Sequence, residues 1–337
     1  MAYPWHSQPL EALLARADRL PHALLFRGRA GIGKLALAEA LARALLCENK
    51  GPTARACGRC VACGWMEQGS HPDFRRLEPE ILSESREPEE GSDKKPSLEI
   101  RIEQVRAIAG FIAMTTHRNG AKVILIHPAE SLNVNAANAL LKNLEEPPPR
   151  TYFLLVAHRW RQLPATLRSR CEQVVLAPPP REVAREWLAQ QKLPDAELAL
   201  AHAGGAPLLA VAFDEDYWRQ RALLLTAITH PRFDALASAE QLRETAPGLV
   251  VGCLQKWASD LVRHKVTGEV CYNPDYAEAV AAAAARLGLV EAVRYLRHVV
   301  RLQRSVAHPL NARLFLEQLL LEYGALLRQA AAAEQAA

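Results

Sequence analysis

The feature that most constrains the fold is a glycine-rich segment between a strand-like run and a helical pattern. It reads Gly28-Arg29-Ala30-Gly31-Ile32-Gly33-Lys34, with an apolar run at residues 23–26 before it and helical spacing over residues 34–46 after it. These are the first seven positions of a phosphate-binding loop, in which glycines turn backbone N–H groups toward phosphate oxygens and the lysine balances their charge. A glycine-rich turn without a ligand is the alternative, but the flanks favour descent from a nucleotide-binding site.

Strand-like and helical runs alternate along the first half of the chain. Residues 123–126 and 152–156 are almost wholly apolar, as strands buried on both faces of a parallel sheet are. Residues 102–113 and 133–144 carry apolar side chains at helical spacing and lack proline. The alternation predicts an α/β P-loop domain with a mostly parallel sheet over residues 1–178.

Two other stretches differ in composition from this pattern. Residues 84–97 are charged and rich in Pro, Ser and Gly, which predicts a flexible surface insertion. After the prolines at 178–180, Ala, Leu and Arg dominate at helical spacing, and the breaker cluster Gly204-Gly205-Ala206-Pro207 interrupts this region. We therefore expect a small helical domain at 179–212 and a larger all-α domain at 213–337.

Bulk properties exclude several classes of protein. The 337 residues are 50% hydrophobic and 23% charged, and no apolar run approaches the ~20 residues of a membrane-spanning helix. The first residues lack a secretory signal pattern, so a cytoplasmic protein without membrane contact is expected. A formal charge of +4 neither proves nor forbids contact with DNA.

The phosphate loop lacks its usual metal ligands. Leu35 stands where an active loop has a Ser or Thr hydroxyl for magnesium, and the run 123–126 is followed by His127-Pro128 where an Asp is expected. Glu130 lies three residues further on, a poor position for a replacement base. Because phosphoryl transfer needs metal, lysine and a positioned water together, we expect weak ATP or ADP binding or none, and no hydrolysis.

Four of the seven cysteines cluster at metal-ligand spacing. Cys47, Cys57, Cys60 and Cys63 form a Cys-x9-Cys-x2-Cys-x2-Cys pattern, and a cytoplasmic protein keeps such thiols reduced. The pattern predicts a structural Zn²⁺ with four thiolates, closing an insertion at 47–63; free thiols are the alternative. Three further cysteines are expected to be ordinary thiols, namely Cys171, Cys253 and Cys271.

Two later motifs complete a resemblance to a known family. Residues 138–148 read NALLKNLEEPP, and Leu167-Arg168-Ser169-Arg170-Cys171 follows. With the loop and the cysteines, they make the chain similar to bacterial clamp-loader AAA+ subunits, most strongly over residues 24–171. The resemblance implies an AAA+ fold with a lid domain at 179–212 and a collar domain at 213–337, where only length and helical character agree.

Within that family, the chain is similar to the member with a degraded ATPase site. Leu35, His127 and the absence of a sensing arginine near residues 204–207 depart from the motor subunits. The resemblance implies that Arg170 is an arginine finger acting in trans on a neighbouring subunit's ATP; a surface arginine is the alternative, and Arg168 is the weaker candidate. Glu145 and Glu146 are expected to end a helix, because adjacent helical residues point about 100° apart.

The resemblance also implies partners and a process. They are motor subunits and a clamp-opening subunit in a pentameric ring, with the sliding clamp and primer-template DNA reached through the assembly during DNA replication. The chain would be a non-enzymatic accessory subunit of a DNA polymerase holoenzyme. One alternative is an active AAA+ motor ATPase. Another is a zinc-dependent nucleic-acid-binding module, disfavoured because no basic run or aromatic stripe accompanies the cysteines.

Overall fold

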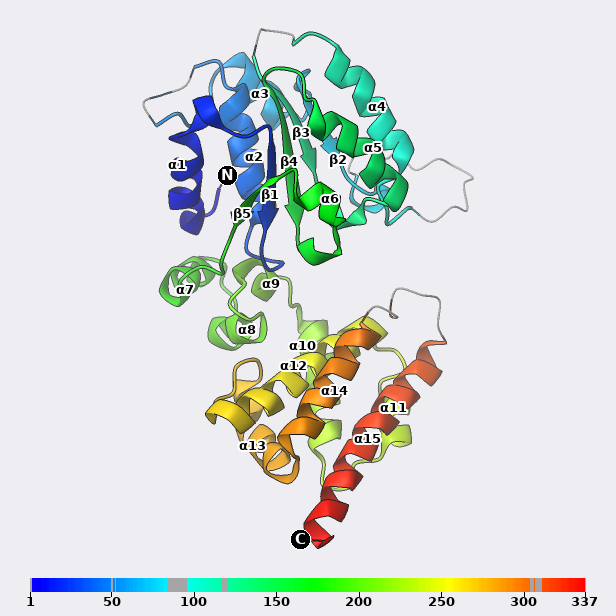
Figure 1. The fold of residues 1–337 in the computed structure, drawn as a ribbon. Coiled ribbons are helices and arrows are strands. Elements are labelled where there is room, and N and C mark those ends of the chain that lie inside the picture. Colours follow the sequence, from blue (N-terminus) through cyan, green and yellow to red (C-terminus); the bar gives the residue numbers. More distant parts are fainter. Residues whose placement is uncertain are drawn as a thin grey trace. The chain divides into compact units, whose positions relative to one another are not determined.

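A parallel five-stranded sheet lies at the centre of the first half of the chain in the computed structural model (Figure 1). The spatial order of its strands is β2-β3-β4-β1-β5, and each neighbouring pair is parallel. Their bounds are β1 (Ala23–Arg27), β2 (Phe74–Leu77), β3 (Lys122–Ile126), β4 (Thr151–Ala157) and β5 (Glu172–Val175). The predicted α/β fold with a parallel sheet is confirmed.

The described residues are 2–49, 51, 53–83, 96–116, 120–303, 306 and 311–336, with side chains as far as residue 328. They form two compact units, Met1–Val183 and Ala184–Ala337. Residues 84–95, most of the predicted surface insertion, lie outside the described part of the chain. The finer boundaries expected at 178/179 and 212/213 stay predictions.

Helices cover both faces of the sheet, with α1 and α2 on one side and α4 and α5 on the other (Figure 1). Ile124, Phe153 and Leu155 are fully buried against α4 and α5. Burial on both faces explains why the central strands are continuous apolar runs. The helices are α1 (Ser7–Leu14), α2 (Lys34–Leu46), α3 (Val61–Glu67), α4 (Ile102–Ala113), α5 (Val134–Glu145) and α6 (Ala165–Arg168), with 3₁₀ turns η1 (Pro4–His6), η2 (Ala17–Arg19), η3 (Glu80–Leu82), η4 (Ala129–Ser131) and η5 (Trp160–Gln162).

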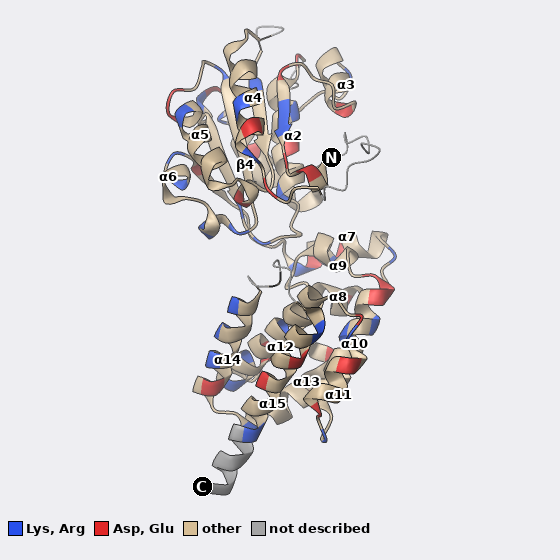
Figure 2. Cartoon of the chain, turned by 90° about the vertical axis from the view of Figure 1, so that its right-hand side faces the viewer, with Lys and Arg blue, Asp and Glu red and all other residues tan. Residues whose placement is uncertain are grey.

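The second unit is helical throughout its described residues, as expected. Its core surrounds Trp257, which is fully buried together with Leu254 and Leu316. Basic and acidic residues are both spread over its helices (Figure 2). The helices are α7 (Arg181–Gln190, which begins in the first unit), α8 (Ala196–His202), α9 (Pro207–Val211), α10 (Glu215–Thr229), α11 (Ala235–Gln241), α12 (Pro247–Thr267), η6 (Pro274–Tyr276), α13 (Ala277–Arg286), α14 (Leu289–Leu302) and α15 (Ala312–Ala336).

Among the residues that could be searched, no helix combines the length and the hydropathy needed to cross a bilayer.

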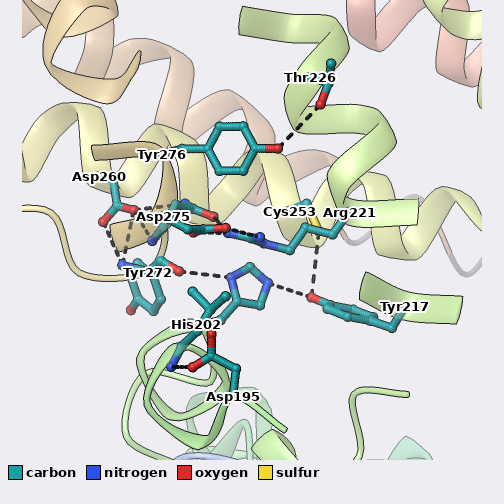
Figure 3. Close-up of polar contacts among 12 residues, drawn as sticks. Asp195, His202, Tyr217, Arg221, Thr226, Cys253, Asp260, Tyr272, Asp275 and Tyr276 are labelled. Carbon is teal, nitrogen blue, oxygen red and sulfur yellow. Dashed lines mark hydrogen bonds and ion pairs between the residues drawn. The ribbon is translucent and has the colours of Figure 1, made fainter. Parts of the chain in front are cut away.

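A buried histidine ties α8 to the larger helices of its unit (Figure 3). His202 is completely buried; its Nδ1 lies 3.0 Å from the Tyr272 carbonyl oxygen and its Nε2 lies 2.8 Å from the Tyr217 hydroxyl. The Lys256 ammonium donates to the same hydroxyl at 3.0 Å. Burial lowers the pKa of His202 to about 2, so the ring is neutral and donates through one nitrogen only.

A second group of buried polar residues holds the loop before η6 (Figure 3). The Asp260 carboxylate is fully buried and accepts the backbone N–H groups of residues 271–273 at 2.8–3.1 Å. Arg221 donates to both carboxylate oxygens of Asp275 at 2.7 Å and to Asn273 at 2.9 Å. Because buried charges are tolerated only when paired, this arrangement fixes the loop against α10 and α12.

Candidate functional site

The phosphate loop connects the end of β1 to the start of α2, as the sequence predicts. Gly28 has φ +156°, and a Cβ there would lie 2.4 Å from the Leu176 carbonyl oxygen. Gly33 is the N-cap residue of α2 with φ +81°, and Gly31 has φ 77°. These positions require glycine, because other residues rarely adopt such backbone angles and the space beside Gly28 is filled.

Lys34 is turned toward the loop itself. Its side chain is almost fully buried, and its ammonium donates to the carbonyl oxygen of Arg29. Burial lowers the pKa of Lys34 to about 8, and the nearby negative charge of Glu130 opposes this shift. The group that would neutralise an outer phosphate is therefore engaged by its own loop.

The N-terminal turn η1 packs on the loop, a feature that the sequence analysis missed. Trp5 Nε1 donates to the Ile32 carbonyl oxygen at 2.9 Å, and His6 Nε2 lies 2.9 Å from the same oxygen. The Tyr3 ring stacks on Trp5, and a Cβ on Gly33 would lie 2.6 Å from Tyr3 Cδ2. Aromatic side chains of the chain thus fill the space next to the last glycine of the loop.

Two histidines meet where an active ATPase has its magnesium carboxylate. His127 follows β3 and His158 follows β4, and their Nε2 atoms are 3.3 Å apart. Burial lowers the pKa of each imidazole to about 4, helped for His127 by the neighbouring His158 and for His158 by Lys34. Both rings are neutral at pH 7, and neutral imidazole is a poor ligand for magnesium.

Glu130 does not take over the missing role. Its side chain is only 3% exposed, and Oε1 accepts the backbone N–H groups of His158 at 3.0 Å and Arg159 at 2.8 Å. The second oxygen accepts from His158 at 3.2 Å. The carboxylate caps the turn after β4, and both of its oxygens are engaged by backbone N–H groups of its own chain.

The four clustered cysteines converge on one point. Cys47 ends α2, Cys60 is the N-cap of α3, and the sulfur atoms of all four residues lie within 4.8 Å of one another. The Cys47–Cys60 and Cys57–Cys63 sulfur pairs are each 3.9 Å apart. Zinc bound tetrahedrally by thiolates at ~2.3 Å separates its sulfurs by ~3.8 Å. The four residues therefore fit a zinc ion.

Backbone N–H groups near the sulfur atoms also fit a zinc site of four thiolates. The N–H group of Cys57 donates to Cys47 Sγ at 3.3 Å, and that of Cys63 donates to Cys60 Sγ at 3.4 Å. Hydrogen bonds to sulfur favour the thiolate form and orient it, as the outer partners of metal ligands do. By contrast, Cys171 and Cys253 are buried outside this cluster, and burial raises the pKa of each thiol.

Arg170 lies between α6 and β5, apart from the loop and the cysteines. Its Nη1 donates to the Thr166 carbonyl oxygen at 2.8 Å, and its Nη2 pairs with the Glu145 carboxylate at the end of α5. The side chain keeps 34% of its surface exposed. Arg168 instead lies with its guanidinium 5.4 Å from the Trp160 ring centroid. The partnership of Glu145 with Arg170 was not foreseen, although α5 does end at Glu145.

The sheet, the phosphate loop and the helical second half define the class of protein, an α/β P-loop protein with a helical C-terminal half. Two family models match: DNA polymerase III, delta subunit, over residues 7–180, and DNA polymerase III, delta subunit, C terminal, over residues 215–324. The chain belongs to this family, and more closely to its delta' subunits.

Curated relatives carry the delta' name. DNA polymerase III subunit delta' of Pseudomonas aeruginosa is 39% identical over 274 residues, 79% of this chain and 78% of the relative. The subunit delta' of Yersinia pestis is 33% identical over 335 residues, 94% of each protein. A solved structure of a gamma subunit-related protein from Thermotoga maritima aligns with 94% of this chain and 99% of its own, at 18% identity and a TM-score of 0.47.

Proposed function

We propose that the chain is a non-hydrolysing, stator-like subunit of the replicative clamp loader. Its family and the delta' names of its relatives support a part in DNA replication as an accessory subunit of DNA polymerase III. The observation that carries the finer proposal is the contrast between its two sites. The loop lacks both magnesium ligands, whereas Arg170 presents a partly exposed guanidinium.

A guanidinium of this kind can act on another subunit's nucleotide. An arginine supplied in trans stabilises the charge that develops on a transferring phosphoryl group. The proposed neighbours are motor subunits and a clamp-opening subunit in a pentameric ring, which loads the sliding clamp on primer-template DNA. The chain itself would bind ATP or ADP weakly or not at all and would hold one structural Zn²⁺ through its four clustered cysteines.

The test is a reconstituted loader that carries Arg170→Ala. Because an arginine finger contributes about 10³ to 10⁵ in rate, hydrolysis at the facing ATP site should fall by at least tenfold. Arg168→Ala, two residues away, is the matched control and should retain clamp- and DNA-stimulated ATPase near wild type. Activity unchanged by Arg170→Ala, with the ring assembled, would show that the finger assignment is wrong.

The second candidate, an active motor ATPase, is tested on the purified chain alone. Leu35 and His127 remove the expected magnesium ligands, so we expect no magnesium-dependent turnover of ATP. Robust turnover that disappears in Lys34→Ala would favour the motor assignment instead.

A further inference from the structure

The guanidinium of Arg170 is held on two sides by its own chain. One terminal nitrogen donates to the Thr166 carbonyl oxygen at 2.8 Å, and the other pairs with Oε1 of Glu145. Thr166 belongs to the short helix α6, and Glu145 is the last residue of α5. Two elements separated in sequence therefore fix where the end of this long side chain lies.

This arrangement leaves the guanidinium able to bind a further anion. Arginine carries five N–H donors in a planar fork. The contacts of Arg170 with the Thr166 carbonyl oxygen and the Glu145 carboxylate use one terminal nitrogen each. The side chains of Arg170 and Glu145 are 34% and 49% exposed, so a partner surface can reach them. The contacts restrict the rotamers of Arg170 without occupying all of its donors.

The strength of the pair suits orientation better than permanent sequestration. Ion pairs at this exposure are weak, since water screens the charges and two flexible side chains must be ordered. A phosphoryl group, with more charge and several acceptor oxygens, competes well for the remaining donors. Glu145 can thus bias the guanidinium toward one direction without withholding it from a nucleotide.

We propose that Glu145 is a positioning residue, which orients Arg170 for the phosphoryl group bound by a neighbouring subunit. The proposal rests on the function proposed above, because it requires Arg170 to act in trans. Holding a reacting group in its working geometry removes part of the entropic cost of the reaction. Loss of Glu145 should therefore slow the chemical step more than it weakens nucleotide binding.

The chain offers a matched control in the next residue. Glu146 has the same side chain but lies beyond the last turn of α5, with φ −128° and ψ 67°, and its side chain is exposed. The ion pair described for Arg170 is with Glu145, not with Glu146. Glu145→Gln and Glu146→Gln remove the same charge from adjacent positions, so only the contact with Arg170 distinguishes them.

The experiment compares reconstituted loaders carrying Glu145→Gln, Glu146→Gln, Arg170→Ala or both Glu145→Gln and Arg170→Ala. We expect Glu145→Gln to lower kcat of the clamp- and DNA-stimulated ATPase about two- to fivefold, the effect of losing one exposed ion pair, with KM changed less than twofold. Glu146→Gln should match wild type. The double variant should match Arg170→Ala, because the effect of Glu145 passes through that arginine.

The outcomes separate this inference from the proposed function. If Arg170→Ala leaves the ATPase unchanged, the finger in trans is wrong. If Arg170→Ala lowers it while Glu145→Gln equals Glu146→Gln, only the positioning role is wrong. An increase of kcat in Glu145→Gln, or a further loss in the double variant, also overturns that role. Size-exclusion profiles and melting curves of the two glutamine variants should coincide, which excludes misfolding as the cause.

Discussion

His127 and His158 set the chemistry of the loop's surroundings. They meet at the ends of β3 and β4 with 3.3 Å between nitrogens, and burial keeps both neutral. Lys34 and the capped carboxylate of Glu130 lie in the same electrostatic environment. These side chains interact with one another, and neither Leu35 nor His127 offers an oxygen ligand for magnesium.

The same histidines predict how stability depends on pH. Their folded-state pKa of about 4 lies below the ordinary 6.5, so between these values the unfolded chain takes up protons that the folded chain refuses. The free energy of unfolding is therefore highest above pH ~6.5 and decreases as the pH falls toward 4. The decrease is about 1–2 kcal/mol per histidine after allowance for partial exposure.

Urea-dependent proteolysis of the protein at pH 7 and pH 4.5, followed through the peptides that contain β3 and β4, measures this loss of stability. His127→Gln together with His158→Gln should make the loss of stability on acidification smaller than in the wild type. His264→Gln, in the second unit, should not change it. Loss of a bound metal at low pH would affect all three proteins alike, so an equal acid sensitivity of all three would contradict the assignment to these two histidines.

At the scale of elements, the cysteine cluster joins the end of α2 to the start of α3. Cys47 is the C-cap of one helix and Cys60 the N-cap of the other, with their sulfurs 3.9 Å apart. The described residues between them are all exposed or half-buried. A metal ion bound by the four thiolates would hold such a segment in place.

We predict one zinc ion per purified chain, lost in Cys60→Ser because a serine hydroxyl stays protonated at neutral pH and binds zinc poorly. Hydrogen exchange over residues 47–67 should become faster in this variant, while exchange in β1 and β4 stays slow. Elemental analysis measures the metal. Cys271→Ser, outside the cluster, is the control and should keep the zinc; a wild-type chain without stoichiometric metal would contradict the assignment.

At the scale of the whole molecule, the second unit is held together by polar groups as well as by its apolar core. His202 links α8 to Tyr217 of α10, 15 positions away, and to the loop before η6, 70 positions away. The network is closed, because the Tyr217 hydroxyl also accepts from Lys256 and contacts Cys253. Such networks specify one arrangement of helices, since each buried polar atom has its partner only there.

Replacing His202 by Ala should destabilise the second unit by about 2–4 kcal/mol, through a cavity and the loss of its hydrogen bonds with the Tyr217 hydroxyl and the Tyr272 carbonyl oxygen. Exchange of the α8 and α10 amides should increase most. Tyr217→Phe should have a smaller effect, because the ring remains. His264→Ala, half-buried and outside this network, is the control. Equal destabilisation by His202→Ala and His264→Ala would contradict a stabilising role for the hydrogen bonds of His202.

The sequence by itself determined the features that depend on residues close together along the chain. Ala23–Arg27, the glycines of the loop and the start of α2 at Lys34 were recognisable, because strand burial, positive φ and helix periodicity each leave a local pattern. The spacing of Cys57, Cys60 and Cys63 likewise implied a shared ion, and the distances between sulfurs fit that prediction.

Only the tertiary structure decided contacts between distant residues. The edge strands β2 and β5 carry FRRL and EQVV and acquire their identity by pairing with β3 and β1. Trp5 reaches Ile32 across 27 positions, and Arg170 reaches Glu145 across 25. No local pattern encodes such pairs, because a polar side chain satisfies its hydrogen bonds with whatever the completed fold brings near.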